Sequence, residues 1–150
     1  MDDTSFIQEG ELMGNNMELG YEMFCYQCEQ TAGGKGCTKL GVCGKTPEIA
    51  GLQDLLIFQI KGISCYAKTF IEQEQHVDKS IVTFIENALF TTLTNVNFDA
   101  DAHVKLLRQS QEIKETLKSS VGEINNPTYH ATYKLPNDKN EMLKDAYIAG

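Results

Sequence analysis

Four cysteines gathered between residues 25 and 43 are the feature that most constrains this chain. The run reads CYQCEQTAGGKGCTKLGVC, which is a C-x2-C-x8-C-x5-C spacing. A C-x2-C pair aims two thiolates at one side of a tight turn, and the glycines that follow allow a close wrap and bring backbone N–H groups near sulfur. We therefore predict that residues 23–46 form a cysteine-rich loop around an iron–sulfur cluster. Its expected ligands are Cys25, Cys28, Cys37 and Cys43.

Charge and hydropathy exclude several classes of partner. The formal net charge is −8 and the pI is near 4.8, which argues against nucleic acid and against anionic lipid surfaces. No apolar run approaches the roughly 20 residues of a membrane helix, and the acidic start lacks the features of a secretory signal. We expect a cytoplasmic protein, and in a reducing compartment clustered cysteines are more often metal ligands or redox groups than disulfides.

Spacing alone leaves three kinds of site open. A zinc site also uses four thiolates, but it usually pairs one C-x2-C with a second such pair or with histidines, whereas the second half here is C-x5-C. A thioredoxin-like redox pair needs a strand before the motif and a helix after it. An iron–sulfur cluster accommodates the irregular spacing best. Lys35, Lys39 and Lys45 also place positive charge beside it in an otherwise acidic chain.

Downstream of the loop, apolar residues recur at three- and four-residue steps, which predicts helices. Strand patterns are nearly absent, so we predict an all-α fold, an antiparallel three-helix bundle over residues 47–150 that is incomplete by itself. Residues 1–22 are expected to be a mobile acidic leader, and residues 123–136 irregular. Helices are predicted from a cap at Thr46 over about 47–74, from a cap at Asp78 to about 93, from a cap at Asp99 to about 120, and at about 137–148.

The residues outside the loop offer no second site. Cys65 falls on the first long helix, where a single thiol is most simply a small buried apolar residue. His76, His103 and His130 each stand alone, and we interpret them as surface or hydrogen-bonded histidines.

Two segments resemble the hybrid cluster proteins, which are also called hydroxylamine reductases or prismane proteins. The first is the run MFCYQCEQTAGGKGCTKLGVCGKTPEIAGLQDLLIFQIKGIS at residues 23–64, and the second is FTTLTNVNFD at residues 90–99. The resemblance extends to about residue 120. It implies that Cys25, Cys28, Cys37 and Cys43 ligate a [4Fe–4S] cubane, because the family's [2Fe–2S] members have wider third and fourth gaps.

The resemblance also implies a function. Members of that family reduce hydroxylamine to ammonia and water, and nitric oxide reduction is associated with them. Their catalytic iron–sulfur–oxygen cluster takes His, Glu and Cys ligands from later domains, and this chain has no cysteine after Cys65. We therefore expect an amino-terminal fragment without catalytic residues. It would pass electrons inward from a reductase or ferredoxin-like donor protein. The alternative is a stand-alone iron–sulfur electron-transfer protein.

Overall fold

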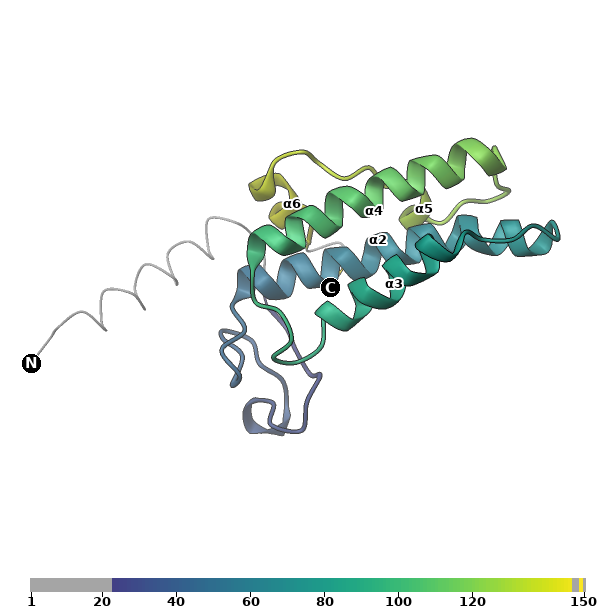
Figure 1. Ribbon diagram of the computed structural model, residues 1–150. Coiled ribbons are helices and arrows are strands. Elements are labelled where there is room, and N and C mark those ends of the chain that lie inside the picture. The colour runs from purple at the N-terminus through teal and green to yellow at the C-terminus, as the bar shows by residue number, and fades with distance from the viewer. Residues whose placement is uncertain (1–22, 147–148, 150) are drawn as a thin grey trace, which may run out of the picture.

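The computed structural model describes residues 23–146 and 149, and within them the regular structure is helical. The predicted all-α fold is confirmed. The only pairing of extended backbone in this part of the chain is an isolated antiparallel bridge between Cys25 and Cys37. Figure 1 shows the helices side by side, with the cysteine-rich loop extending from one end of them. The elements are the 3-10 turn η1 (Ala32–Gly34) and the helices α2 (Pro47–Glu72), α3 (Lys79–Thr91), α4 (Ala100–Val121), α5 (Tyr129–Thr132) and α6 (Lys139–Asp145).

Capping residues define where the helices begin, as the sequence predicts. The Thr46 side chain accepts a hydrogen bond from the Ile49 N–H at 3.3 Å, and Pro47 is the first residue of α2. Asp99 likewise accepts from the N–H groups of Asp101 and Ala102, at 2.9 and 3.1 Å. Each cap satisfies backbone donors that the first helical turn leaves without partners.

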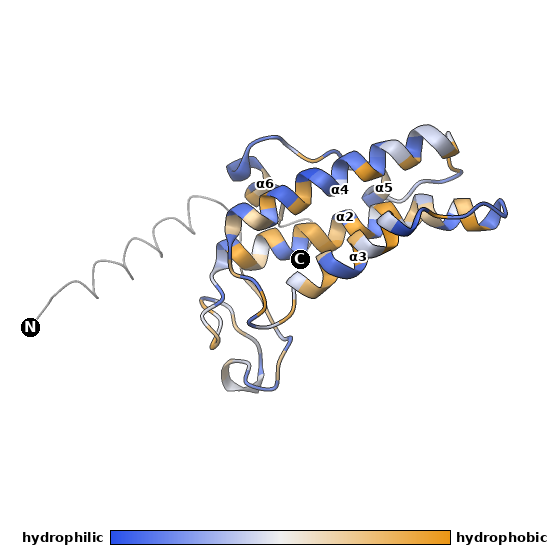
Figure 2. Ribbon diagram, in the orientation of Figure 1, coloured by the Kyte–Doolittle hydropathy of each residue, from blue (hydrophilic) through white to orange (hydrophobic). Residues whose placement is uncertain are grey.

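Helix α2 is the centre of the fold, because it contacts α3, α4, α5 and α6. Figure 2 shows apolar positions concentrated where these helices face one another. The residues of this core with no more than 2% of their surface exposed are Leu52, Leu55, Leu56, Ile63, Ala88, Leu107, Met142 and Leu143. Helix α3 contributes only Phe84 and Ala88 as buried residues, while Leu89 near its end and Leu93 just beyond it are exposed.

Helix α5 lies within the stretch 123–136 that the sequence predicted to be irregular. It is a single turn, and it packs against α2 at Gly62. A Cβ atom at Gly62 would collide with the His130 carbonyl oxygen, so only glycine admits this approach. Phe58 of α2 completes the contact, with its ring centroid 4.3 Å from that of His130 and 5.5 Å from that of Tyr133. Packing against α2 therefore holds a turn too short to persist alone.

A buried lysine joins α4 to this contact. The Lys114 ammonium donates to Gln59 Oε1 at 2.5 Å, to the Tyr133 carbonyl at 2.6 Å and to the His130 carbonyl at 3.4 Å. Its three N–H donors thus meet three acceptors, which fits the charged form. Burial nevertheless lowers the pKa of Lys114 to about 8. That value includes smaller contributions from charges nearby: Glu115 and Cys65 raise the pKa of Lys114, and Lys118 lowers it.

The lowered pKa of Lys114 predicts that the stability of the fold changes with pH in the alkaline range. Between about pH 8 and the ordinary lysine pKa, the unfolded chain binds more protons at this residue than the folded chain. The free energy of unfolding should therefore rise with pH across this window, by up to about 3 kcal/mol from this group. Urea unfolding of wild type and Lys114→Met from pH 7.5 to 10.5 measures this effect. The free energy of unfolding of wild type should rise with pH relative to that of the variant. A difference between the two proteins that stays constant with pH would contradict the prediction.

Two sequence predictions extend outside the described residues. The acidic leader at residues 1–22 lies there entirely, and the helix predicted to reach Ile148 ends at Asp145, with residues 147 and 148 not described. No helix in the described part of the chain has the length and apolar character needed to span a membrane.

Candidate metal centre

The loop places Cys25 and Cys37 opposite each other. The Cys25 N–H donates to the Cys37 carbonyl at 3.0 Å, and the Cys37 N–H donates to the Cys25 carbonyl at 2.9 Å. Directly opposed residues of an antiparallel pair carry their side chains on the same face, with Cβ atoms roughly 4.5–5.5 Å apart. Two of the four predicted ligands, twelve positions apart in sequence, are therefore brought together by backbone hydrogen bonds.

Hydrogen-bond donors surround the Cys37 sulfur, and Cys37 is the one loop cysteine that is fully buried. The Ala32 N–H donates to Cys37 Sγ at 3.4 Å. The Thr31 hydroxyl lies 3.6 Å from the same sulfur and 3.0 Å from the Cys25 carbonyl oxygen, so its single hydrogen can be donated to either acceptor. The N–H of Ala32, the backbone near Val42 and the Thr31 hydroxyl lower the pKa of the Cys37 thiol, against the opposing effect of burial. This surrounding favours the thiolate, which is the form that binds metal.

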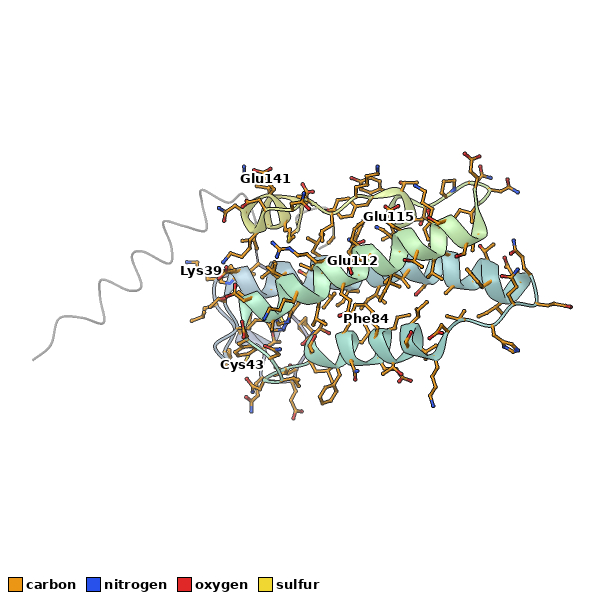
Figure 3. All side chains as sticks on the ribbon, turned by 45° about the horizontal axis from the view of Figure 1, so that its top comes forward. Lys39, Cys43, Phe84, Glu112, Glu115 and Glu141 are labelled. Atoms are coloured by element: carbon orange, nitrogen blue, oxygen red, sulfur yellow. The ribbon has the colours of Figure 1, made fainter. Side chains whose placement is uncertain are left out.

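Cys43 lies in a separate tight turn. The Gly41 N–H donates to the Lys45 carbonyl and the Gly44 N–H donates to the Gly41 carbonyl, each at 2.8 Å. A Cβ atom at Gly41 would come within 3.2 Å of Cys43 Sγ and 3.1 Å of the Lys45 backbone nitrogen, so a side chain there would crowd the turn. Cys28 and Cys43 are partly exposed. Figure 3 shows Cys43 and Lys39 at the end of the molecule where α2 begins.

Lys45 brings a positive charge to the loop's inner side. Only 2% of its surface is exposed, although it follows Cys43 by two residues. Its Nζ atom lies 3.9 Å from Cys25 Sγ and 3.3 Å from Gln27 Oε1, and donates to both. Lys35 and Lys39, the other two lysines of the loop, are exposed.

The loop between α3 and α4 lies beside the cysteine-rich loop (Figure 1). The Thr94 hydroxyl donates to Gln27 Oε1 at 3.4 Å, which connects the second sequence segment to the first. Gln53 anchors this loop to α2, because its Nε2 donates to the carbonyls of Thr91 and Asn97 at 3.4 and 3.3 Å. His103 is fully buried beside it, with Nδ1 2.7 Å from the Asp99 carbonyl. The residues TLTNVNFD, at positions 92–99, thus contact the cysteine-rich loop through Gln27.

The four predicted cysteines share one loop, but their side chains are not gathered around one point. In residues 23–146 and 149, no three Cys, His, Asp or Glu side chains are close enough to hold a single metal ion. The donor chemistry does fit an iron–sulfur cluster: four thiols, with an N–H donor on the Cys37 sulfur and an ammonium on the Cys25 sulfur. Cys65 is elsewhere, on α2, with its sulfur 3.3 Å from the Thr128 hydroxyl.

Sequence reasoning missed part of the surroundings of these cysteines. Thr31 contacts the Cys37 sulfur, and Gln27 contacts the Lys45 ammonium. Nothing in the spacing of these two residues indicates either contact. Lys45 was singled out only for its charge. Its burial accompanies the turn in which the Gly41 N–H donates to the Lys45 carbonyl, and no local sequence pattern indicates that burial.

Comparison of the sequence with known proteins shows its family. Residues 23–150 match the family model described as Prismane/CO dehydrogenase family. A hydroxylamine reductase of Bacteroides thetaiotaomicron is 47% identical over 105 residues, which cover 70% of this chain and 19% of the relative. One of Thermotoga maritima is 55% identical over 84 residues, covering 56% and 19%. One of Zymomonas mobilis is 40% identical over 128 residues, covering 85% and 24%.

The chain thus spans about a fifth of the length of the curated relatives it matches. The matched range includes the cysteine-rich loop, the α3–α4 loop beside it and the helices that support both. Because the family model matches most of its length, the chain belongs to the Prismane/CO dehydrogenase family.

Proposed function

We propose that these residues are the amino-terminal, electron-entry part of a cytoplasmic hydroxylamine reductase, with a [4Fe–4S] cluster held by Cys25, Cys28, Cys37 and Cys43. The observation that carries the proposal is the loop itself, where N–H and ammonium donors face the sulfurs of Cys25 and Cys37. The relatives named hydroxylamine reductase support the reaction. Nitric oxide is a second candidate substrate of the whole protein.

Each part of the loop has a task in this proposal. The bound cluster would supply one-electron uptake and release. The four thiolates hold it, the backbone pair of Cys25 and Cys37 orients two of them, and the Ala32 N–H and Lys45 ammonium stabilise negative charge on their sulfurs. Breaking the N–O bond of hydroxylamine consumes two electrons and two protons, so the whole enzyme needs a route by which single electrons enter.

The surface around the loop suits a protein donor of electrons. Phe24, Tyr26, Leu40 and Val42 are each more than half exposed, and the exposed Lys35 and Lys39 lie among them. An acidic reductase or ferredoxin-like protein would complement this mixture of apolar and positive groups. Docking here would bring the donor's own redox group close to the partly exposed Cys28 and Cys43.

Anaerobic reconstitution with iron and sulfide tests the cluster. We expect about four iron atoms and about four acid-labile sulfides per chain, broad visible absorption, and an electron paramagnetic resonance signal after reduction with dithionite. A colourless protein with one zinc ion and no sulfide would contradict the proposal and favour a zinc-stabilised helical module.

The reductase assignment has its own test. The longest reading frame that contains these residues is expressed, and ammonia formation from hydroxylamine is measured with a chemical electron donor. Turnover supports the reductase. A cluster-bearing product that takes up electrons without turning over hydroxylamine would instead favour a stand-alone electron-transfer protein.

A further inference from the structure

We infer that the positive charge of Lys45 sets the reduction potential of the cluster. Gln27 holds the ammonium in place, and Thr94 of the α3–α4 loop in turn holds Gln27. The buried ammonium makes the cluster easier to reduce. The inference rests on the proposed cluster. It gives Lys45, Gln27 and Thr94 a role in the reduction potential that the spacing of the cysteines does not indicate.

The first support is the burial of Lys45. A lysine ammonium is strongly hydrated, and lysine is almost never fully buried unless it is paired. Lys45 nevertheless exposes only 2% of its surface and directs Nζ at Cys25 Sγ, 3.9 Å away. A charge removed from water is screened far less by salt than one at the surface. Of the three lysines in the loop, Lys45 is therefore the one whose charge acts most strongly on the cysteine sulfurs.

The second support is how the ammonium is fixed. Gln27 Oε1 accepts hydrogen bonds from Lys45 Nζ at 3.3 Å and from the Thr94 hydroxyl at 3.4 Å. Thr94 belongs to a loop that Gln53 anchors to α2 through two backbone carbonyls. The position of the positive charge is thus determined by α2 and the α3–α4 loop as well as by the cysteine-rich loop.

The third step is electrostatic. Reduction adds one electron, and hence one negative charge, to a cluster that its thiolates already make negative. A fixed positive charge at one of those sulfurs stabilises the reduced form more than the oxidised form. The electron itself comes from the donor, which is dithionite in the experiment below, and no proton transfer at Lys45 is involved.

The test compares two lysines of the same loop in the reconstituted chain. Lys45→Met removes the buried charge and keeps an unbranched side chain one atom shorter, and Lys39→Met makes the same change at an exposed position. Potentials are measured by spectroscopic titration with dithionite. We expect Lys45→Met to lower the equilibrium constant for reduction about tenfold, which is about 59 mV for one electron. Lys39→Met should change it less than about twofold, by an amount that shrinks as salt is raised.

Further variants separate charge from structure. Lys45→Arg should stay within about twofold of wild type because it retains the charge. Thr94→Val removes the hydroxyl that holds Gln27 but keeps the Lys45 side chain. Because the ammonium is then held less firmly near Cys25 Sγ, the potential should shift in the same direction by a smaller amount. If Lys45→Met fails to assemble a cluster, Thr94→Val decides, and an unchanged potential in that variant would overturn the inference.

Equal shifts for Lys45→Met and Lys39→Met would also overturn it. Failure of the wild-type chain to bind iron and sulfide is a different result, since it removes the proposed cluster itself. The two failures are therefore distinguishable from the iron and sulfide content of the wild-type protein.

Discussion

The Cys28→Ser variant is expected to emerge from anaerobic reconstitution without visible absorption, and with its iron content reduced from about four atoms per chain to less than one. A serine hydroxyl does not ionise near neutral pH, so it cannot replace the thiolate that binds iron. Cys28 lies in the turn where its carbonyl accepts from the Thr31 N–H at 3.2 Å, and serine preserves that backbone bond. Iron, sulfide and absorption measurements check the result.

Cys65→Ala is the matched control for the loss of a thiol. Its sulfur contacts the Thr128 hydroxyl and lies on α2, apart from the loop. This variant should keep the full iron and sulfide content. Normal iron in Cys28→Ser, or loss of iron in Cys65→Ala, would show that the ligand set is wrong.

The Gly62→Ala variant is expected to lose about 2–4 kcal/mol of the free energy of unfolding. In an unobstructed helix the same substitution stabilises by roughly 0.5–1 kcal/mol, because glycine loses more backbone entropy on folding. At Gly62 the new methyl group collides with the His130 carbonyl oxygen and would also lie 3.0 Å from the Lys114 side chain. Either α5 or Lys114 must move, and the hydrogen bonds of the buried ammonium weaken.

Urea unfolding followed by circular dichroism measures this loss as a lower midpoint. Ser64→Ala, at an exposed position two residues further along α2, is the control and should change the stability by less than about 1 kcal/mol. A Gly62→Ala protein as stable as wild type would mean that α5 does not pack tightly on α2.

Most helix limits could be predicted from the sequence, because local side chains determine them. Thr46, Asp78 and Asp99 each cap a helix in the structure as predicted, and α4 ends at Val121 with Gly122 following it. These signals act within one turn of the chain, so they can be recognised without knowing the packing.

Residues whose role depends on distant contacts could not be predicted. Helix α5 follows Asn125, Asn126 and Pro127, which favour a turn, and it exists because α2 has a glycine where it passes. Lys114 occurs among the charged residues of α4, and its burial is explained by the acceptors that Gln59, His130 and Tyr133 bring to it from elsewhere in the chain. The position of Lys114 in the sequence does not indicate that it is buried.

The candidate site also has features that the sequence predicts and features that only the structure shows. The cysteine spacing predicted the ligand set, which the reconstitution experiment and the Cys28→Ser variant will test. The segment TLTNVNFD was recognised by resemblance, and the structure adds that Thr94 reaches Gln27. That contact joins residues 67 positions apart, so no local pattern could indicate it.

The backbone pair of Cys25 and Cys37 has a consequence for how the protein is loaded. Many small metal-binding loops are unfolded until the metal arrives, and binding must then offset the loss of chain entropy. Here backbone N–H and C=O groups make the pairing of Cys25 and Cys37, so it uses none of the sulfur atoms that would bind a cluster. A backbone pairing of this kind would keep two of the four ligands adjacent independently of the cluster, and would thereby reduce the chain entropy lost on binding.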